Sequence, residues 1–229
     1  MTPHVSPHII TVFGGKGGIG KTTIAEHLAW ACADEGKTLL VDADTGQQSA
    51  ANLYARYQDG APFDLTVEHD PHLLGKLSSV PYDWVIVDAP PHADQAAAGI
   101  EVASLVLVPV VPRILDVQAI MRTINQTLLG RTYRVVLSRV TPWTRTKPNA
   151  RADAVAQALA GQSVPLLSTR IREYLMPHET ARGEGLPLTH PKLSQPIDDP
   201  FAGTPFDRAA YDMRAACAEV IQIMKGGER

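Results

Sequence analysis

Residues 8–23, HIITVFGGKGGIGKTT, join an apolar run, a glycine-rich loop and the beginning of a helical pattern. The apolar run has the length of one buried strand. Residues 15–22 satisfy the pattern G-x4-G-K-[ST] in full. In this pattern the glycines let successive backbone N–H groups point toward phosphate oxygens, and the positive end of the following helix adds to their field. The stretch therefore predicts a phosphate-binding loop between a strand and a helix.

The rest of the chain repeats this alternation of apolar runs and helical patterns. Further apolar runs lie at 38–43, 84–89, 105–110 and 134–140. Helical patterns lie at 21–35, 94–103, 116–129 and 150–160. Strands that alternate with helices indicate an α/β fold with a doubly wound, mostly parallel sheet flanked by helices.

Length and composition favour one domain. The 229 residues are 45% hydrophobic, which suits a single P-loop domain over 1–229. We expect residues 1–8 to form a loose N-terminus and the proline-rich segment 186–206 to cross the surface. A last helix over 207–225, with Asp207 as its N-cap, should dock on the core. No apolar stretch reaches bilayer-spanning length and the N-terminus lacks the features of a signal peptide, so we expect a cytoplasmic protein and no membrane partner.

Two groups beside the loop predict a magnesium–nucleotide site. Lys21 would neutralise the outer phosphates and the Thr22 hydroxyl would ligate Mg²⁺. Asp88 ends the apolar run of YDWVIVDAPP (82–91), where ligands bind at the carboxyl ends of parallel strands. The alternative for a lone aspartate at a strand end is a helix cap or a turn, but the phosphate loop favours the metal role.

Four segments resemble the ParA/MinD family of ATPases, which carry a deviant Walker A motif with a second lysine. They are KGGIGKTT (16–23), KTLLVDADTGQQSA (37–50), YDWVIVDAPP (82–91) and VLVPVVPRILDVQAI (106–120). The likeness covers nearly the whole chain. It implies ATP and Mg²⁺ as cofactors and ATP hydrolysis as the reaction. The expected nucleotide-binding residues of the loop are Gly15, Lys16, Gly17, Gly18, Ile19, Gly20, Lys21, Thr22 and Thr23. Arg139, near the end of a predicted strand, is expected to face the base of the nucleotide.

The resemblance also implies why the loop has two lysines. In the family the first lysine reaches across a dimer interface to the partner's nucleotide, so Lys16 would contact the partner's ATP while Lys21 contacts its own. The chain would then form an ATP-dependent homodimer. Asp44 matches the family residue that activates the attacking water, which makes Lys16, Lys21 and Asp44 the catalytic set. Asp42 would support the magnesium shell with Thr22 and Asp88. The chain has Thr45-Gly46 where the family usually has Pro-Gln, which puts the geometry of this segment in question.

A basic middle third suggests a polyanion partner. Residues 110–185 carry 11 Lys and Arg against 5 Asp and Glu, although the net charge of the chain is −3. STRIREYLMPHETARGEG (168–185) is similar to the family region that contacts DNA, so Arg170, Arg172 and Arg182 are the expected DNA-binding residues. The resemblance is strongest to short ParA-type proteins that partition plasmid or chromosome DNA. It implies non-specific DNA binding, association with the nucleoid, and a ParB-like centromere-binding protein or cargo adaptor as partner.

Three alternatives stay open. One is a MinD-like or protein-cargo positioning ATPase, which keeps the enzyme and changes the surface on which it acts. Another is a binding module that dimerises on ATP with little turnover. The third is a small-molecule kinase or ligase, which is disfavoured because Lys16 has no role there.

Overall fold

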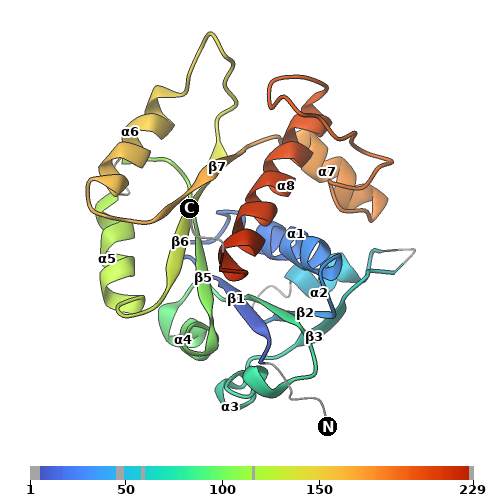
Figure 1. The fold of residues 1–229 in the computed structure, drawn as a ribbon, viewed down its shortest axis with the longest axis vertical. Coiled ribbons are helices and arrows are strands. Elements are labelled where there is room, and N and C mark those ends of the chain that lie inside the picture. Colours follow the sequence, from blue (N-terminus) through green and yellow to red (C-terminus); the bar gives the residue numbers. More distant parts are fainter. Residues whose placement is uncertain (1–5, 45–48, 58–59, 115–116, 227–229) are drawn as a thin grey trace.

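A single parallel sheet of seven strands organises the chain (Figure 1). The computed structural model describes residues 6–44, 49–57, 60–114 and 117–226. The strand order is β3-β2-β4-β1-β5-β6-β7, and every neighbouring pair is parallel. The strands are β1 (His8–Val12), β2 (Thr38–Asp42), β3 (Asp64–Val67), β4 (Trp84–Asp88), β5 (Leu105–Val110), β6 (Tyr133–Val140) and β7 (Leu166–Arg172).

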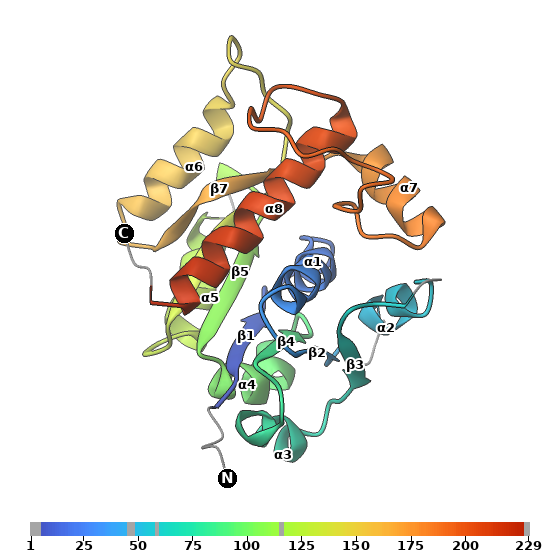
Figure 2. The same ribbon diagram turned by 45° about the vertical axis from the view of Figure 1, so that its right-hand side comes forward.

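Helices cover both faces of the sheet. One face carries α1 (Lys21–Ala33), α2 (Ser49–Tyr54), α7 (Leu175–Glu184) and α8 (Pro205–Met224), as the turned view in Figure 2 shows. The other face carries α3 (Pro71–Leu74), α4 (Ala93–Val102), α5 (Val117–Thr127) and α6 (Ala150–Ala160). A short 3₁₀ helix, η1 (Leu77–Ser79), follows α3.

The central strands are buried on both faces, which explains their continuous apolar runs. In β1, Ile10 and Val12 pack with the α1 and α8 layer, whereas Ile9 packs with the opposite layer. All five residues of β2 and of β4 are buried. The register places Asp42 beside Asp88, so the two aspartates end adjacent strands at the same edge of the sheet.

The predicted fold class is confirmed, and each of the five predicted strands is present within one residue at either end. The two edge strands, β3 (DLTV) and β7 (LLSTRIR), were not predicted. Each contains polar residues, because an edge strand has a neighbouring strand on one side only and is partly exposed to solvent. His8 of β1 pairs with Trp84 of β4, so the expected loose terminus ends before His8. Residues 1–5 lie outside the described residues.

The last helix begins slightly earlier than expected. Thr204 is its N-cap and Pro205 its first residue, while Asp207 accepts a hydrogen bond from the Thr204 backbone in a reciprocal capping box. The preceding proline-rich segment is tied to this helix, because Arg214 donates to the Thr189 carbonyl at 2.7 Å. Over the part of the chain that the structure describes, no helix has the length and apolarity needed to cross a bilayer.

Candidate functional site

The phosphate loop connects β1 to α1 at the carboxyl edge of the sheet. Gly18 and Gly20 have φ values of 70° and 96°, which side chains other than glycine rarely adopt. Gly20 is also the N-cap of α1 and supplies no side-chain cap, so the first backbone N–H groups of the helix remain available to an anion. The geometry is that of a phosphate cradle.

Lys21 is the buried cation of this loop. It is 8% exposed, and its Nζ donates to the Lys16 carbonyl at 3.4 Å. Burial lowers the pKa of Lys21, while the carboxylates of Asp88 and Asp44 oppose that effect. Lys16, by contrast, is exposed on the loop. The two lysines, five positions apart in sequence, thus differ in exposure: the side chain of Lys21 is buried and that of Lys16 is exposed.

Thr22 and Asp88 form the expected magnesium side of the site. The Thr22 hydroxyl donates to Asp88 Oδ2 at 2.7 Å, and Asp88 Oδ1 is buried without a hydrogen-bond partner among the described residues. Burial raises the pKa of Asp88 to about 7, partly offset by the hydrogen bond from Thr22. A hydroxyl and a buried carboxylate oxygen with unused acceptor capacity suit a hard divalent cation, so the residues fit Mg²⁺.

Asp42 and Asp44 differ in their surroundings. Asp42 is fully buried, and its two oxygens accept from the backbone N–H groups of Asp44 at 3.2 Å and Ala51 at 3.0 Å. It therefore fixes both ends of the connection from β2 to α2. Asp44 is half-buried and lines the nucleotide cavity, as its predicted catalytic role requires. The unusual Thr45-Gly46 pair lies outside the described residues.

A cavity of about 640 Å³ extends from the phosphate loop. Its lining includes the polar side chains of Lys21, Thr22 and Asp44. It also includes the larger, mainly nonpolar side chains of Ile24, Ile171, Tyr174, Leu175 and Met213. A cavity of this size with both kinds of lining suits a nucleoside polyphosphate.

Arg139 reaches the loop from the end of β6. It adopts a left-handed φ of 50°, its Nη1 donates to the Gly18 carbonyl, and its Nε donates to Glu173 Oε1 at 2.6 Å. The side chain therefore contacts the phosphate loop itself. Its binding to nucleotide stays a prediction.

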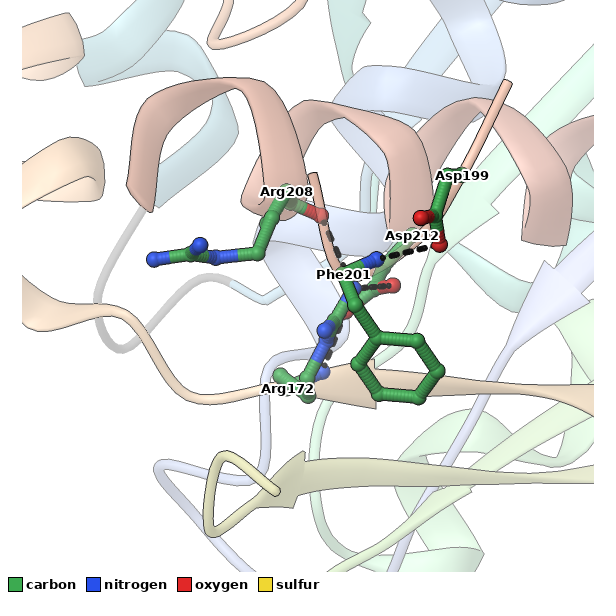
Figure 3. Close-up of polar contacts among 5 residues, drawn as sticks. All are labelled: Arg172, Asp199, Phe201, Arg208 and Asp212. Carbon is green, nitrogen blue, oxygen red and sulfur yellow. Dashed lines mark hydrogen bonds and ion pairs between the residues drawn. The ribbon is translucent and has the colours of Figure 1, made fainter. Parts of the chain in front are cut away.

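Arg172, which the sequence suggested for DNA, is a buried structural residue (Figure 3). It is 1% exposed and binds Asp212 of α8 through Nε at 2.8 Å and Nη2 at 2.7 Å. Its guanidinium carbon lies 5.0 Å from the ring centre of Trp143 and 5.8 Å from that of Phe201. It offers no surface to a polyanion, so this part of the prediction is corrected: Arg172 joins β7 to α8.

The other two arginines of the expected DNA set lie apart from each other. Arg170 is half-buried and pairs with Asp153 of α6 at 2.6 Å. Arg182 is exposed on α7 and lines the nucleotide cavity. Sequence reasoning did not identify the Arg172–Asp212 pair or the cavity residues of α7. No local motif marks them, because β7, α7 and α8 meet the loop only in the folded chain.

Comparisons with known proteins identify a nucleotide-binding family. The family described as CobQ/CobB/MinD/ParA nucleotide binding domain matches residues 10–174. A protein of Gloeobacter kilaueensis named "Maintenance of carboxysome distribution protein A" is 37% identical over 188 residues, 80% of this chain and 84% of the relative. A protein of Halothiobacillus neapolitanus with the same name is 32% identical over 166 residues, covering 69% of this chain and 76% of the relative.

Solved structures share the fold at lower identity. The cell division ATPase MinD of Pyrococcus furiosus has a TM-score of 0.69 at 21% identity, covering 94% of this chain and 99% of that one. A Cyanothece McdA variant in complex with ATP has a TM-score of 0.66 at 18% identity, covering 98% and 99%. The chain belongs to the CobQ/CobB/MinD/ParA nucleotide-binding family, and it is a ParA/MinD-type ATPase that uses ATP and Mg²⁺.

Proposed function

We propose that this ATPase positions a large protein assembly inside the cell, with the carboxysome as the first cargo to test. The observation that carries the proposal is the pair of relatives named for carboxysome distribution, which match most of both chains at 37% and 32% identity. DNA partition, the function that the sequence favoured, has weaker support, because these relatives are named for a protein cargo. The protein-cargo alternative is therefore the preferred one.

The proposed switch is an ATP-dependent homodimer. Lys21 lines the nucleotide cavity, whereas Lys16 lines a second hollow of about 290 Å³ with Val110, Ile120 and Arg113. Lys16 is thus not among the residues that line the cavity assigned to its own nucleotide. This supports a role for Lys16 on the partner's ATP, where a cation would offset the repulsion between two bound triphosphates.

Gel filtration with and without ATP tests this switch. Lys16→Ala should bind ATP and stay monomeric, whereas Asp44→Ala should form the dimer and hydrolyse ATP about 100-fold more slowly or worse, because it lacks the group that orients the water. Lys76→Ala, an exposed substitution between α3 and η1, is the control and should behave as the parent. A Lys16→Ala protein that dimerises and turns over normally would remove the basis of the switch.

Non-specific DNA is the surface on which we propose that the dimer moves. Several basic residues of the middle third are exposed and could contact phosphates: Arg113, Arg122, Arg131, Arg145, Lys147 and Arg151. Contacts of this kind weaken steeply with salt. Co-sedimentation with DNA at two salt concentrations, with ATP and with ADP, tests the surface. A cargo-bound adaptor would release the protein by stimulating hydrolysis.

Deletion of the gene in the native host distinguishes the two cargo hypotheses. A protein-cargo ATPase predicts clustered carboxysomes and unchanged plasmid retention, and the Asp44→Ala variant should fail to restore their spacing. Loss of plasmids with evenly spaced carboxysomes would instead support DNA partition.

A further inference from the structure

Arg182 joins the nucleotide cavity from a distant part of the chain. It lies in the last turn of α7, and its Nη2 is 3.1 Å from the Thr23 hydroxyl, 159 positions away in sequence. Thr23 belongs to the first turn of α1, whose backbone N–H groups face the phosphates. The guanidinium of Arg182 therefore lies beside the phosphate cradle.

The charge of Arg182 is not neutralised by an ion pair with any residue that the structure describes. The carboxyl group of Glu26 interacts electrostatically with Arg182. Glu26 is buried and accepts a hydrogen bond from the Tyr57 hydroxyl. Burial raises the pKa of Glu26 to about 8, so it is largely protonated at neutral pH. His27 and His178, on the same wall, are neutral there because burial lowers their pKa values to about 4 and about 3. Among the described residues of this wall, Arg182 therefore keeps its positive charge without an ion-pair partner.

The helix that carries Arg182 is firmly seated. It ends at Gly185, which has a φ of 61° and packs so closely that a Cβ there would lie 2.1 Å from the Arg56 carbonyl oxygen. Its buried face includes Pro177 and Ala181. The guanidinium is therefore presented from a fixed helix end rather than from a free loop, which lowers the entropic cost of binding an anion.

Arg182 and Thr23 both line the nucleotide cavity, and Thr23 directly follows Thr22 at the start of α1. Because Lys21 and Thr22 are assigned to the outer phosphates and Mg²⁺, a cation beside Thr23 is available to another phosphate of the same nucleotide. We propose that Arg182 binds the α-phosphate, the group next to the ribose, in both ATP and ADP. The phosphate-loop motif does not include this residue, and its place on α7 links that helix to the occupied nucleotide site. The inference concerns the ATPase itself and holds for any cargo.

Calorimetric titration of the full-length protein with ATP and with ADP, in the presence of Mg²⁺, tests the assignment. Arg182→Ala should lower the affinities for ATP and for ADP by the same factor, about 10-fold or more. Both nucleotides have the α-phosphate, and the variant loses a charge-assisted hydrogen bond to it. Adenosine, measured by competition, should bind as it does to the parent. Arg182→Lys should lose less, since it keeps the charge without the planar fork.

Lys76→Ala is the matched control, because it removes an exposed cation that does not line the cavity. ATP and ADP affinities of Arg182→Ala within twofold of the parent would overturn the proposal. So would an equal loss for adenosine, which would place the effect on the nucleoside. A loss of DNA retention with unchanged nucleotide affinities would return Arg182 to a DNA-binding role. If Arg182→Ala does not fold, Arg182→Gln keeps the length of the side chain without its charge and is judged by the same criteria.

Discussion

Two regions of this molecule bury charged side chains and treat them differently. At the nucleotide cavity, Asp88 leaves one carboxylate oxygen without a described partner, and Lys21 donates to a backbone carbonyl. At the contact between β7 and α8, Arg172 and Asp212 neutralise each other through three hydrogen bonds, one of them from the Arg172 backbone at 2.9 Å. Each region has one buried polar atom without a described hydrogen-bond partner, Asp88 Oδ1 in the first and Arg172 Nη1 in the second, but only the charge of Arg172 is met by a direct ion pair.

The difference shows what distinguishes a binding site from a structural ion pair. Burial of a charge alone does not, because Arg172 and Asp88 are equally inaccessible at 1% exposure. The distinguishing feature is whether the protein itself supplies the counter-charge. Arg172 lies in a basic segment, yet Asp212 cancels its charge inside the fold. The following predictions test this comparison by removing one partner at a time.

The largest effect is expected at the Arg172–Asp212 pair. Asp212→Ala leaves a buried guanidinium without its carboxylate and should lower the free energy of unfolding by about 3–5 kcal/mol. Urea unfolding followed by circular dichroism measures it. The double variant Arg172→Met/Asp212→Leu should recover most of the loss, because a well-packed apolar pair often replaces a buried ion pair at little cost. A loss below about 1 kcal/mol for Asp212→Ala would mean that the pair does not stabilise the contact.

A smaller, pH-dependent effect is expected at Glu26, beside the nucleotide cavity. The pKa of its carboxyl group is raised by burial to about 8 in the folded protein, against an ordinary value of 4.5. The unfolded chain releases this proton first, so the contribution of Glu26 to stability should fall as pH rises from about 4.5 to about 8 and stay level above that. The groups facing Glu26 are Tyr57, Arg182 and Asp88.

Glu26→Gln should remove the contribution of this carboxyl group to the pH profile. Its stability relative to the parent should be about 2–4 kcal/mol higher at pH 8.5 than at pH 5, measured by urea unfolding without nucleotide. Glu101→Gln, an exposed substitution on α4, should leave the pH profile of the parent unchanged. Parallel profiles for Glu26→Gln and the parent would show that Glu26 is ionised in the fold at neutral pH.

The fold could be predicted from sequence where burial on both faces leaves a continuous apolar run. The five central strands have such runs, and each was found in place. The edge strands have no neighbouring strand on one side, and in β7 (LLSTRIR) three consecutive polar residues interrupt the apolar run, so no continuous apolar pattern marks this strand. The N-cap of α8 was misplaced by three positions because Thr204 and Asp207 both satisfy capping rules and act together.

The site residues also fall into two groups, those that a local motif predicts and those that only tertiary contacts identify. The phosphate loop, Thr22 and Asp88 follow from local motifs, because one short connection builds the cradle and the strand ends converge beside it. The sequence could not distinguish the roles of the three arginines in this segment. Arg170, Arg172 and Arg182 lie within thirteen positions of one another. Only the tertiary contacts give them three different partners: Asp153, Asp212 and Thr23.

The smallest effect is expected at the Arg170–Asp153 pair, two positions along the strand from Arg172. Its side chains are 26% and 41% exposed, so water screens the charges, and Asp153→Ala should change the free energy of unfolding by less than about 1 kcal/mol. The same change frees the guanidinium of Arg170. If Arg170 contacts DNA, salt-sensitive DNA retention of Asp153→Ala should rise above that of the parent, and Arg170→Ala should abolish the gain. Unchanged retention would place the DNA surface elsewhere, whereas a loss of stability near that of Asp212→Ala would mean that exposure does not separate the two ion pairs.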